Sequence, residues 1–304
     1  MCPAQPLLAL FLSLAPDVGS VPYEAADTLQ RIDSPLGYTA AVLCTGITGA
    51  DGLALSPSGV LYAVSESCGE VYRIDPPCSP VTVMQGLDHP EGVAVDGSGV
   101  VYICEDTGMG RALALHPDGT VETISDSLQF PEGIAVSSGG DVFVSESSVE
   151  TGGFPPFLTG VRRLCANGSE VVQSSLYLWS MSDIAVDGAG MVYACNELSG
   201  YAFIRESVII LAPDTGEWTV FARGLHSCEG ICSTPGSFFP LYVAEEDTGG
   251  GRGRVSILYE DGGSAVVADG FQNIEDVAVD GSGRIFVSED TTGMIILLYP
   301  PATR

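Results

Sequence analysis

One short pattern of apolar and polar positions recurs along the chain and predicts paired β-strands. Its clearest copy is PEGVAVDGSGVVY, from Pro90 to Tyr102, in which two apolar runs flank the group DGSG. Glycine accepts the backbone angles that a tight hairpin turn requires, so this group predicts a turn between two strands. Related segments begin at residues 131, 181 and 274, and looser copies begin at residues 50 and 228. We therefore expect six β-hairpins of the same kind.

The residues after each hairpin predict two further strands. In the second copy, a returning strand at Val100–Cys104 is followed by apolar segments at Ala112–Leu115 and Thr120–Ile124, with a turn between them. The second residues of the six copies are 51, 91, 132, 182, 229 and 275, so one repeat spans 40 to 50 residues. Four antiparallel strands in a repeat of this length are typical of β-propeller blades. The sequence thus predicts an all-β fold, a six-bladed β-propeller of four-stranded blades.

The two ends of the repeat array predict how the ring closes. The last copy supplies a third strand at Met294–Tyr299 and no fourth, whereas Tyr38–Thr45 is a spare strand ahead of the first copy. We expect this N-terminal strand to complete the last blade, which leaves no open sheet edge. Residues 38–300 are interpreted as a single propeller domain.

Residues 1–20 are interpreted separately, as a signal peptide or as a leader that packs against the domain. The apolar run Pro6–Ala15 is shorter than the roughly 20 residues that a membrane-spanning helix needs. It suits the core of a signal peptide with a cleavage site near Ser20, although positive residues are missing ahead of it. Secretion or a periplasmic location is favoured over the cytoplasm.

The overall charge restricts the classes of partner. The formal net charge is −28, and all eleven cationic side chains are arginines. Binding to nucleic acid or to an anionic membrane requires clustered Lys and Arg, so neither is expected. A hydrophobic content of 45% with only 16% charged residues excludes intrinsic disorder. Metal cations and small neutral molecules remain as partners, and we expect a monomer.

The nine cysteines form no zinc-type motif. Cys68 and Cys78 flank a short predicted strand pair and could form a disulfide. Cys104 and Cys195 occupy equivalent positions where other repeats carry Ser or Ala. We interpret these two as small buried residues and not as nucleophiles.

Acidic residues recur at one end of the predicted blades. The second residue of the first strand would lie at one mouth of the central channel in every blade, and five of the six are acids: Asp51, Glu91, Glu132, Ser182, Glu229 and Glu275. The hairpin register brings the end of the second strand back to the same mouth, with a second set of residues: Ser65, Glu105, Glu146, Asn196, Glu245 and Glu289. The sequence therefore predicts about nine carboxylates on one face of the ring.

Carboxylates that converge in this way repel one another. Two of them at ~4 Å repel by about 4 kcal/mol at an effective dielectric constant near 20. Three arrangements would relieve the repulsion: a bound hard cation such as Ca²⁺ or Mg²⁺, carboxyl groups protonated through raised pKa values, or side chains turned outward onto backbone N–H groups. Residues repeated in every blade are also typical of a scaffold's own hydrogen bonding.

The fourth repeat departs from the pattern, and two histidines lie near the predicted mouth. This repeat carries Ser182 and Asn196, and it places Asp183 where only Asp276 is also acidic. His89 precedes the second copy of the motif, and His226 precedes the fifth. Each histidine is interpreted as a general base, a ligand or an ordinary turn residue.

The longer connections of repeats three to five are expected to emerge at the same mouth. Together with the irregular fourth repeat they supply the residues that we predict for a small-molecule pocket: Trp179, Ser182, Asn196, Tyr201 and Phe157. An apolar rim over a polar floor is typical of such a pocket. Alternatively, these apolar groups pack only on one another.

The repeated P-E-G-[IV]-A-V-D-x-x-G-x-[VI]-Y pattern resembles NHL-type propellers and the related SMP-30/gluconolactonase group, from about Tyr38 to Pro300. The resemblance implies a divalent cation, often Ca²⁺, held in the channel by acids at the starts of inner strands, with one acid assisting hydrolysis. By motif position it implies five candidate ligands: Asp51, Glu91, Glu132, Glu229 and Glu275.

These observations favour a Ca²⁺-dependent hydrolase of small lactones or esters, in which the cation polarises the carbonyl. Glu132, Asp183 or His89 would take a proton from the attacking water. The alternative is a non-enzymatic NHL-type scaffold with a structural cation, which binds a protein or a glycan. A metal-assisted lyase with a histidine base is a third possibility.

Overall fold

Six four-stranded antiparallel sheets make up the protein. The computed structural model describes residues 28–75, 79–150, 157–165, 168–175, 181–196, 207–234, 236–248 and 252–302. Each sheet is one blade, and the blades are numbered here in the order of their first strands. The prediction of an all-β, six-bladed propeller is confirmed.

Blades 1 to 3 each use four consecutive strands. Blade 1 contains β2 (Ala50–Leu55), β3 (Leu61–Ser65), β4 (Glu70–Ile74) and β5 (Val81–Gln85). Blade 2 contains β6 (Pro90–Val95), β7 (Val101–Glu105), β8 (Gly110–Leu115) and β9 (Val121–Leu128). Blade 3 contains β10 (Pro131–Val136), β11 (Val142–Glu150), β12 (Phe157–Cys165) and β13 (Gly168–Ser175).

Blades 4 and 5 follow the same plan, and blade 6 is completed from the N-terminal side. Blade 4 contains β14 (Met181–Val186), β15 (Val192–Asn196), β16 (Ser207–Ala212) and β17 (Glu217–Arg223). Blade 5 contains β18 (Cys228–Thr234), β19 (Ser237–Glu245), β20 (Gly253–Leu258) and β21 (Ser264–Phe271). Blade 6 contains β22 (Ile274–Val279), β23 (Ile285–Glu289), β24 (Met294–Tyr299) and β1 (Thr39–Thr45).

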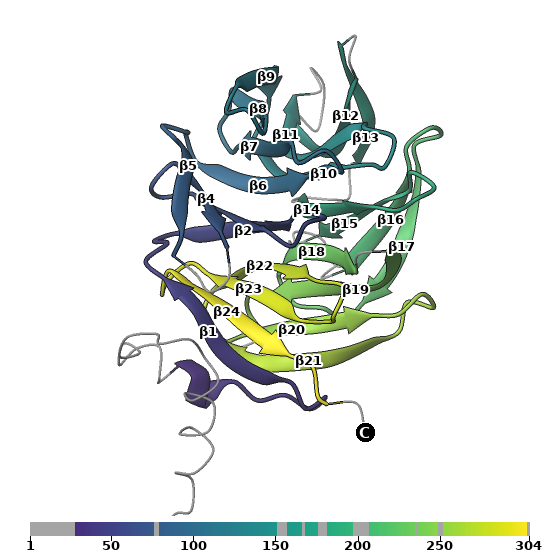
Figure 1. The fold of residues 1–304 in the computed structure, drawn as a ribbon. Helices are drawn as coiled ribbons and strands as arrows, with labels where there is room; N and C mark the ends of the chain where they lie inside the picture. Colours follow the sequence, from purple (N-terminus) through teal and green to yellow (C-terminus); the bar gives the residue numbers. More distant parts are fainter. Residues whose placement is uncertain are drawn as a thin grey trace, which may run out of the picture.

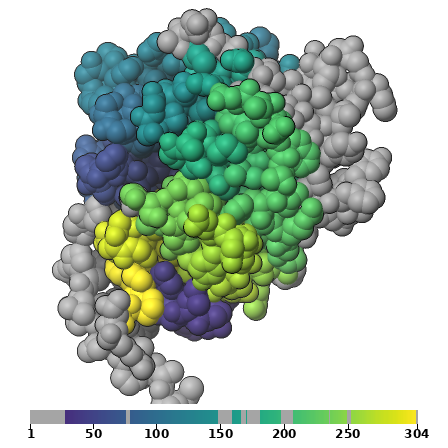
Figure 2. Space-filling view, turned by 90° about the vertical axis from the view of Figure 1, so that its right-hand side faces the viewer, coloured from purple at the N-terminus to yellow at the C-terminus, as the bar shows by residue number. Residues whose placement is uncertain are grey.

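The first strand of each blade lies innermost. Each of these six strands contacts the first strand of the next blade, and β22 contacts β2, so they form a closed ring (Figure 1). The blades follow one another around this ring in sequence order, and the last strands lie beside the N-terminal ones (Figure 2). Buried apolar side chains from neighbouring blades pack between the sheets.

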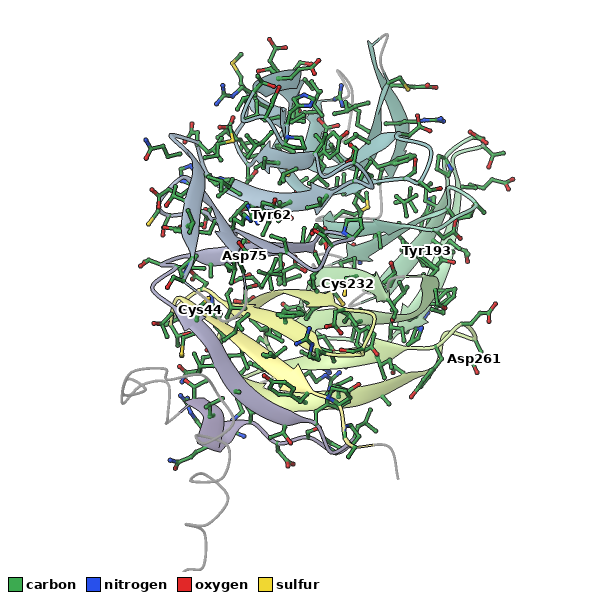
Figure 3. The ribbon with its side chains drawn as sticks, viewed as in Figure 1. Cys44, Tyr62, Asp75, Tyr193, Cys232 and Asp261 are labelled. Carbon is green, nitrogen blue, oxygen red and sulfur yellow. The ribbon has the colours of Figure 1, made fainter. Side chains whose placement is uncertain are left out.

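The ring closes by strand pairing, as the sequence predicts. Strand β1 pairs antiparallel with β24, from Thr39 opposite Tyr299 to Thr45 opposite Met294. Cys44 on β1 is buried in a cluster that also contains Ile295 of β24 (Figure 3). The N-terminal strand therefore covers what would otherwise be an open edge of blade 6.

The predicted DGSG turns are present, with a clear local cause. In blade 2, Oδ1 of Asp96 accepts hydrogen bonds from the backbone N–H groups of Ser98 and Val100, at 2.8 and 2.9 Å. Gly99 has a backbone φ of 87°, which residues with a Cβ atom rarely adopt. The aspartate and the glycine together fix the hairpin between β6 and β7.

The cysteines in equivalent repeat positions are buried, as predicted. Sγ of Cys104 lies 3.3 Å from the carbonyl oxygen of Glu132 in the next blade, and burial raises the pKa of this thiol well above its ordinary value. Cys195 is also buried, and its pKa is raised for the same reason. Cys68 is an exposed thiol, and its predicted partner Cys78 lies outside the described residues.

The segment ahead of β1 packs on blade 5. Asp33 forms a two-way backbone bridge with Asp269, at 2.9 and 2.8 Å, and Oγ of Ser34 donates to the carbonyl of Val267 at 2.5 Å. The expected leader, residues 1–20, lies outside the described residues. Within the described part of the chain, no helix has the length and apolar character to cross a membrane.

Candidate metal centre

A polar cavity of about 250 Å³ lies where the six first strands begin. Its walls are made by seven acidic residues and three glycines: Asp51, Glu91, Glu132, Asp183, Glu229, Glu275, Asp276, Gly52, Gly92 and Gly230. The structure thus brings together all five acids that the resemblance implies as ligands, along with Asp183. That these five acids bind a metal ion remains a prediction.

A β-bulge at the start of every first strand forms this wall. In blade 2, Pro90 pairs with Glu105 and Val93 pairs with Ile103, so Glu91 and Gly92 together oppose one residue of β7. The same shift occurs in the other five blades. Because a bulge redirects side chains, the second and third residues of the strand both reach the cavity.

Glycine at the third position allows neighbouring blades to approach closely. A Cβ atom on Gly52 would overlap the carbonyl oxygen of Glu91, and one on Gly92 would lie 2.5 Å from that of Glu132. Such contacts exclude larger residues unless the backbone shifts. The close approach holds the acids of blades 1 to 3 near one another.

Aspartate replaces this glycine in blades 4 and 6, and in each case it bonds to the next blade. Oδ2 of Asp183 accepts a hydrogen bond from the N–H of Ile231 at 2.9 Å. Oδ2 of Asp276 accepts one from Leu53 at 2.6 Å, and its Oδ1 accepts one from Val277 at 2.6 Å. Burial raises the pKa of Asp183 to about 7, and burial followed by repulsion from Asp183 raises that of Asp276 well above its ordinary value.

The tightest group of carboxylates in the described residues is formed by Asp51, Glu66 and Glu91. One oxygen atom from each lies within 4.8 Å of the other two, and all three side chains are partly buried. Glu66 follows strand β3, and its backbone N–H donates to the carbonyl of Gly49 at 3.0 Å. This bond places Glu66 beside the acids of the two neighbouring first strands.

Burial and repulsion between neighbouring acids raise the pKa values of Asp51 and Glu91. Burial, followed by repulsion from Glu91 and Glu275, raises the pKa of Asp51 well above its ordinary value. Burial, followed by repulsion from Asp106 and Glu132, raises the pKa of Glu91 to about 10. A hard divalent cation would remove this cost, because its charge favours the ionised carboxylates and it prefers oxygen ligands. The donor set therefore fits Ca²⁺ or Mg²⁺.

The second set of glutamates, Glu105, Glu146, Glu245 and Glu289, does not line the cavity, and it shows the third of the predicted arrangements, side chains turned onto backbone N–H groups. These four glutamates are buried and turned away from the cavity, each toward the loop before its own blade. Their carboxylates accept backbone N–H groups at 2.7 to 2.9 Å from four residues: Asp88, Gln129, His226 and Gln272. Three of them also bind arginine side chains, in the pairs Glu105–Arg111, Glu146–Arg162 and Glu245–Arg254.

The side-chain alternation of a β-strand explains this arrangement. Glu105 does pair with Pro90, as the predicted register requires, and cross-strand partners point to the same face of a sheet. Glu91, one residue after Pro90, therefore points elsewhere. In blades 2 and 3 the residue after the glutamate meets the channel acid: Asp106 bonds with Glu91, and Oγ of Ser147 donates to Glu132.

His89 lies on the rim outside the cavity. Its side chain is 60% exposed, and its Nδ1 is 3.0 Å from Oδ1 of Asp88. The hydrogen bond with Asp88 raises its pKa, and the negative charges of Glu66 and Asp106 also favour the protonated imidazole. His226 occupies the turn position of Asp88 and not that of His89, since its N–H donates to Glu245. The two histidines are thus not equivalent.

The predicted small-molecule pocket is only partly described. Ser182 is buried, and its Oγ donates to the carbonyl of Cys228 at 2.5 Å. Asn196 is also buried on β15, and neither side chain lines the cavity. Trp179 and Tyr201 lie outside the described residues, as does the side chain of Phe157, whose backbone begins β12.

Comparison with known proteins supports the fold. No family model matches the chain. No curated protein matches it either. A gluconolactonase from Xanthomonas campestris superposes with a TM-score of 0.71 at 16% sequence identity, over 89% of this chain and 94% of that one. The expected resemblance to this structural group is therefore confirmed at the level of the fold.

Other solved propellers of the same fold carry different activities. A streptogramin B lyase matches with a TM-score of 0.61 at 11% identity, over 88% of this chain and 100% of that one. The aldose sugar dehydrogenase of Streptomyces coelicolor, in its PQQ-bound form, matches with 0.63 at 15% identity, over 88% and 99%. Because one fold carries three chemistries, function has to be argued from the cavity itself.

Proposed function

We propose that this protein is a Ca²⁺-dependent hydrolase that cleaves small, uncharged lactones or esters at the mouth of the central channel. The observation that carries the proposal is the group formed by Asp51, Glu66 and Glu91, whose oxygen atoms lie within 4.8 Å of one another. Carboxylates that crowd together inside a cavity are stabilised by a hard cation more effectively than by water.

Asp51, Glu66 and Glu91 would hold the cation, with Glu132, Glu229 and Glu275 as the remaining acids of the wall. When bound, the cation supplies Lewis acidity to a carbonyl oxygen. Seven acids line the cavity, so an anionic substrate would be repelled and a neutral ester would not.

Asp183 is assigned as the proton acceptor. It lines the same cavity, and a base with a pKa of about 7 is half ionised at neutral pH, where proton transfer is efficient. The oxygen of water forms the new bond to the acyl carbon while the C–O bond to the leaving alcohol breaks. Asp183 takes the proton of that water and returns it to the leaving oxygen, which completes the balance. Glu132 and His89 are less suited as proton acceptors, since Glu132 is bonded to Ser147 and His89 lies on the rim.

The test combines calcium binding with turnover on a panel of lactones and esters. Calorimetry of the full chain is expected to show Ca²⁺ binding that Asp51→Asn or Glu91→Gln weakens at least 10-fold, and a chelator is expected to abolish turnover. Glu122→Gln is the matched control, because Glu122 is an exposed acid on the outer strand β9. Calcium binding that raises the melting temperature without any turnover would overturn the hydrolase and favour the scaffold.

A further inference from the structure

Phe130 adopts a backbone conformation that disfavours a bulky side chain. It precedes β10 and has a φ of 45°, in the left-handed region. The described residues at the same position in other blades also have positive φ: Gly49, His89, Ser227 and Asn273. Glycine and asparagine are tolerated there, whereas phenylalanine is an uncommon choice. The blade architecture imposes this conformation, so it is the choice of phenylalanine that distinguishes blade 3.

The backbone of Phe130 is fixed between two acids of the cavity wall. Its N–H donates to the carbonyl of Thr107 at 2.8 Å, and Thr107 follows Asp106, which bonds with Glu91. Its carbonyl accepts from the N–H of Ser147 at 3.0 Å, and Oγ of Ser147 donates to Glu132. Phe130 therefore stands at the rim of the cavity, between blades 2 and 3.

The ring of Phe130 belongs to an exposed apolar surface. Phe130 is 44% exposed and Met109 is 82% exposed. The ring lies over the turn that carries Met109, since a Cβ atom on Gly108 would be 3.3 Å from its Cζ. Other large exposed apolar residues in the described chain, such as Val81, Val121 and Tyr259, lie on outer strands or outer turns.

We propose that Phe130 and Met109 form the contact surface for an apolar substituent of the substrate. The proposal rests on the function proposed above and specifies its substrate class: lactones or esters that carry an uncharged alkyl or aryl chain. The ester group would reach the acidic cavity while the chain lies on the ring of Phe130. Each methylene buried in this way is expected to improve binding about 4-fold.

The test compares substrates that differ only in chain length. Acetyl, butyryl and octanoyl esters of one alcohol are supplied to the calcium-loaded full chain, and kcat/KM is measured for each. In Phe130→Gly, kcat/KM for the octanoyl ester is expected to fall at least 10-fold, through KM, while the value for the acetyl ester stays within 2-fold. Phe130→Leu is expected to retain most of the preference. Tyr259→Ala is the matched control, because Tyr259 is 45% exposed in the outer turn between β20 and β21.

Thermal denaturation accompanies each variant. Glycine relieves the left-handed strain while the lost ring removes some packing, so the melting temperature of Phe130→Gly is expected to stay within a few degrees of the parent. If Phe130→Gly keeps the parent's ratio of kcat/KM between the octanoyl and acetyl esters, this proposal is overturned and the hydrolase function is unaffected. Absence of turnover on every ester would overturn the hydrolase itself, and this proposal with it.

Discussion

Oδ2 of Asp183 lies 2.9 Å from the backbone nitrogen of Ile231 and accepts its hydrogen bond, so an acid of blade 4 is tied to blade 5. The same relationship links Asp276 of blade 6 to Leu53 of blade 1. Two of the seven acids in the cavity wall thus also connect blades. Because these two aspartates accept backbone N–H groups of the next blade, they hold the ring together while they line the acidic channel.

Asp183→Asn separates the two uses of this side chain. Asparagine keeps an oxygen that can accept from Ile231 and cannot take a proton from water. We expect turnover to fall about 100-fold, while calcium affinity changes less than 3-fold and the melting temperature changes by a few degrees. The pH profile of kcat/KM in the parent protein should rise with the ionisation of Asp183, whose pKa of about 7 in the metal-free cavity is lowered when calcium is bound. Full activity in Asp183→Asn would show that another group takes the proton.

Gly52→Ala is expected to damage the fold and the cation site together. The added Cβ would overlap the carbonyl of Glu91, so blade 2 would have to move away from blade 1. We expect a loss of about 1–3 kcal/mol in unfolding free energy and at least a 10-fold loss of calcium affinity, measured by urea unfolding and calorimetry.

Gly97→Ala provides the control for that substitution. Gly97 lies in the turn after β6, and a Cβ atom there would meet no atom within 4 Å. Its effect on stability and on calcium affinity should stay within about 0.5 kcal/mol. Equal effects of the two substitutions would mean that close blade approach does not shape the site.

The fold could be predicted from local sequence because each blade repeats the same pattern of strands and turns. The DGSG turn and the short apolar strands determine hairpins, and four strands in every 40 to 50 residues are typical of propeller blades. Tyr38–Thr45 could be assigned to blade 6 by simple elimination, and the observed strand Thr39–Thr45 differs by one residue.

The cavity was only partly predictable, because side-chain direction at strand ends depends on the bulge. The five acids at the second position lie together as expected, since they share one repeat position. Glu66 was missed, and Glu105 was expected near the channel acids, whereas Asp106 is the residue that bonds with Glu91. The adjacent pair Glu105-Asp106 carried the available signal, because the extra residue of the bulge belongs to β6 and regular alternation on β7 turns only one of the two toward Glu91.

Glu146 is expected to support stability and not cation binding. Its buried carboxylate holds both Arg162, at 2.7 and 2.9 Å, and the N–H of Gln129. Glu146→Ala leaves a largely buried guanidinium without this partner, so we expect a loss of about 3–5 kcal/mol in unfolding free energy. Asp75→Ala removes the exposed partner of Arg73 and should cost less than about 1 kcal/mol.

The calcium affinity of Glu146→Ala distinguishes a structural role of Glu146 from a role among the acids at the channel mouth. If the folded Glu146→Ala protein binds calcium as the parent does, the second set of glutamates is structural. A selective loss of calcium binding at unchanged stability would instead place Glu146 in the cation site.

Stability in the presence of a chelator is expected to fall as the pH rises. Asp183 and Glu91 have folded-state pKa values of about 7 and about 10, whereas both groups titrate near pH 4 in an unfolded chain. The folded protein therefore holds more protons than the unfolded chain between these limits. Their contribution is complete below about pH 4 and is lost as the pH rises through the folded-state values, by about 1.4 kcal/mol per pH unit for each titrating group.

Calcium should remove this pH dependence, because it replaces the protons that neutralise the cavity. Urea unfolding at pH 5, 6, 7 and 8 is compared with chelator and with saturating calcium, and Glu91→Gln serves as the variant that has lost one titrating group. We expect a steep decline with chelator, a shallower one in Glu91→Gln, and a nearly flat profile with calcium. Unfolding free energies that increase from pH 5 to pH 8 in chelator would contradict the raised pKa values and remove the electrostatic case for a bound cation.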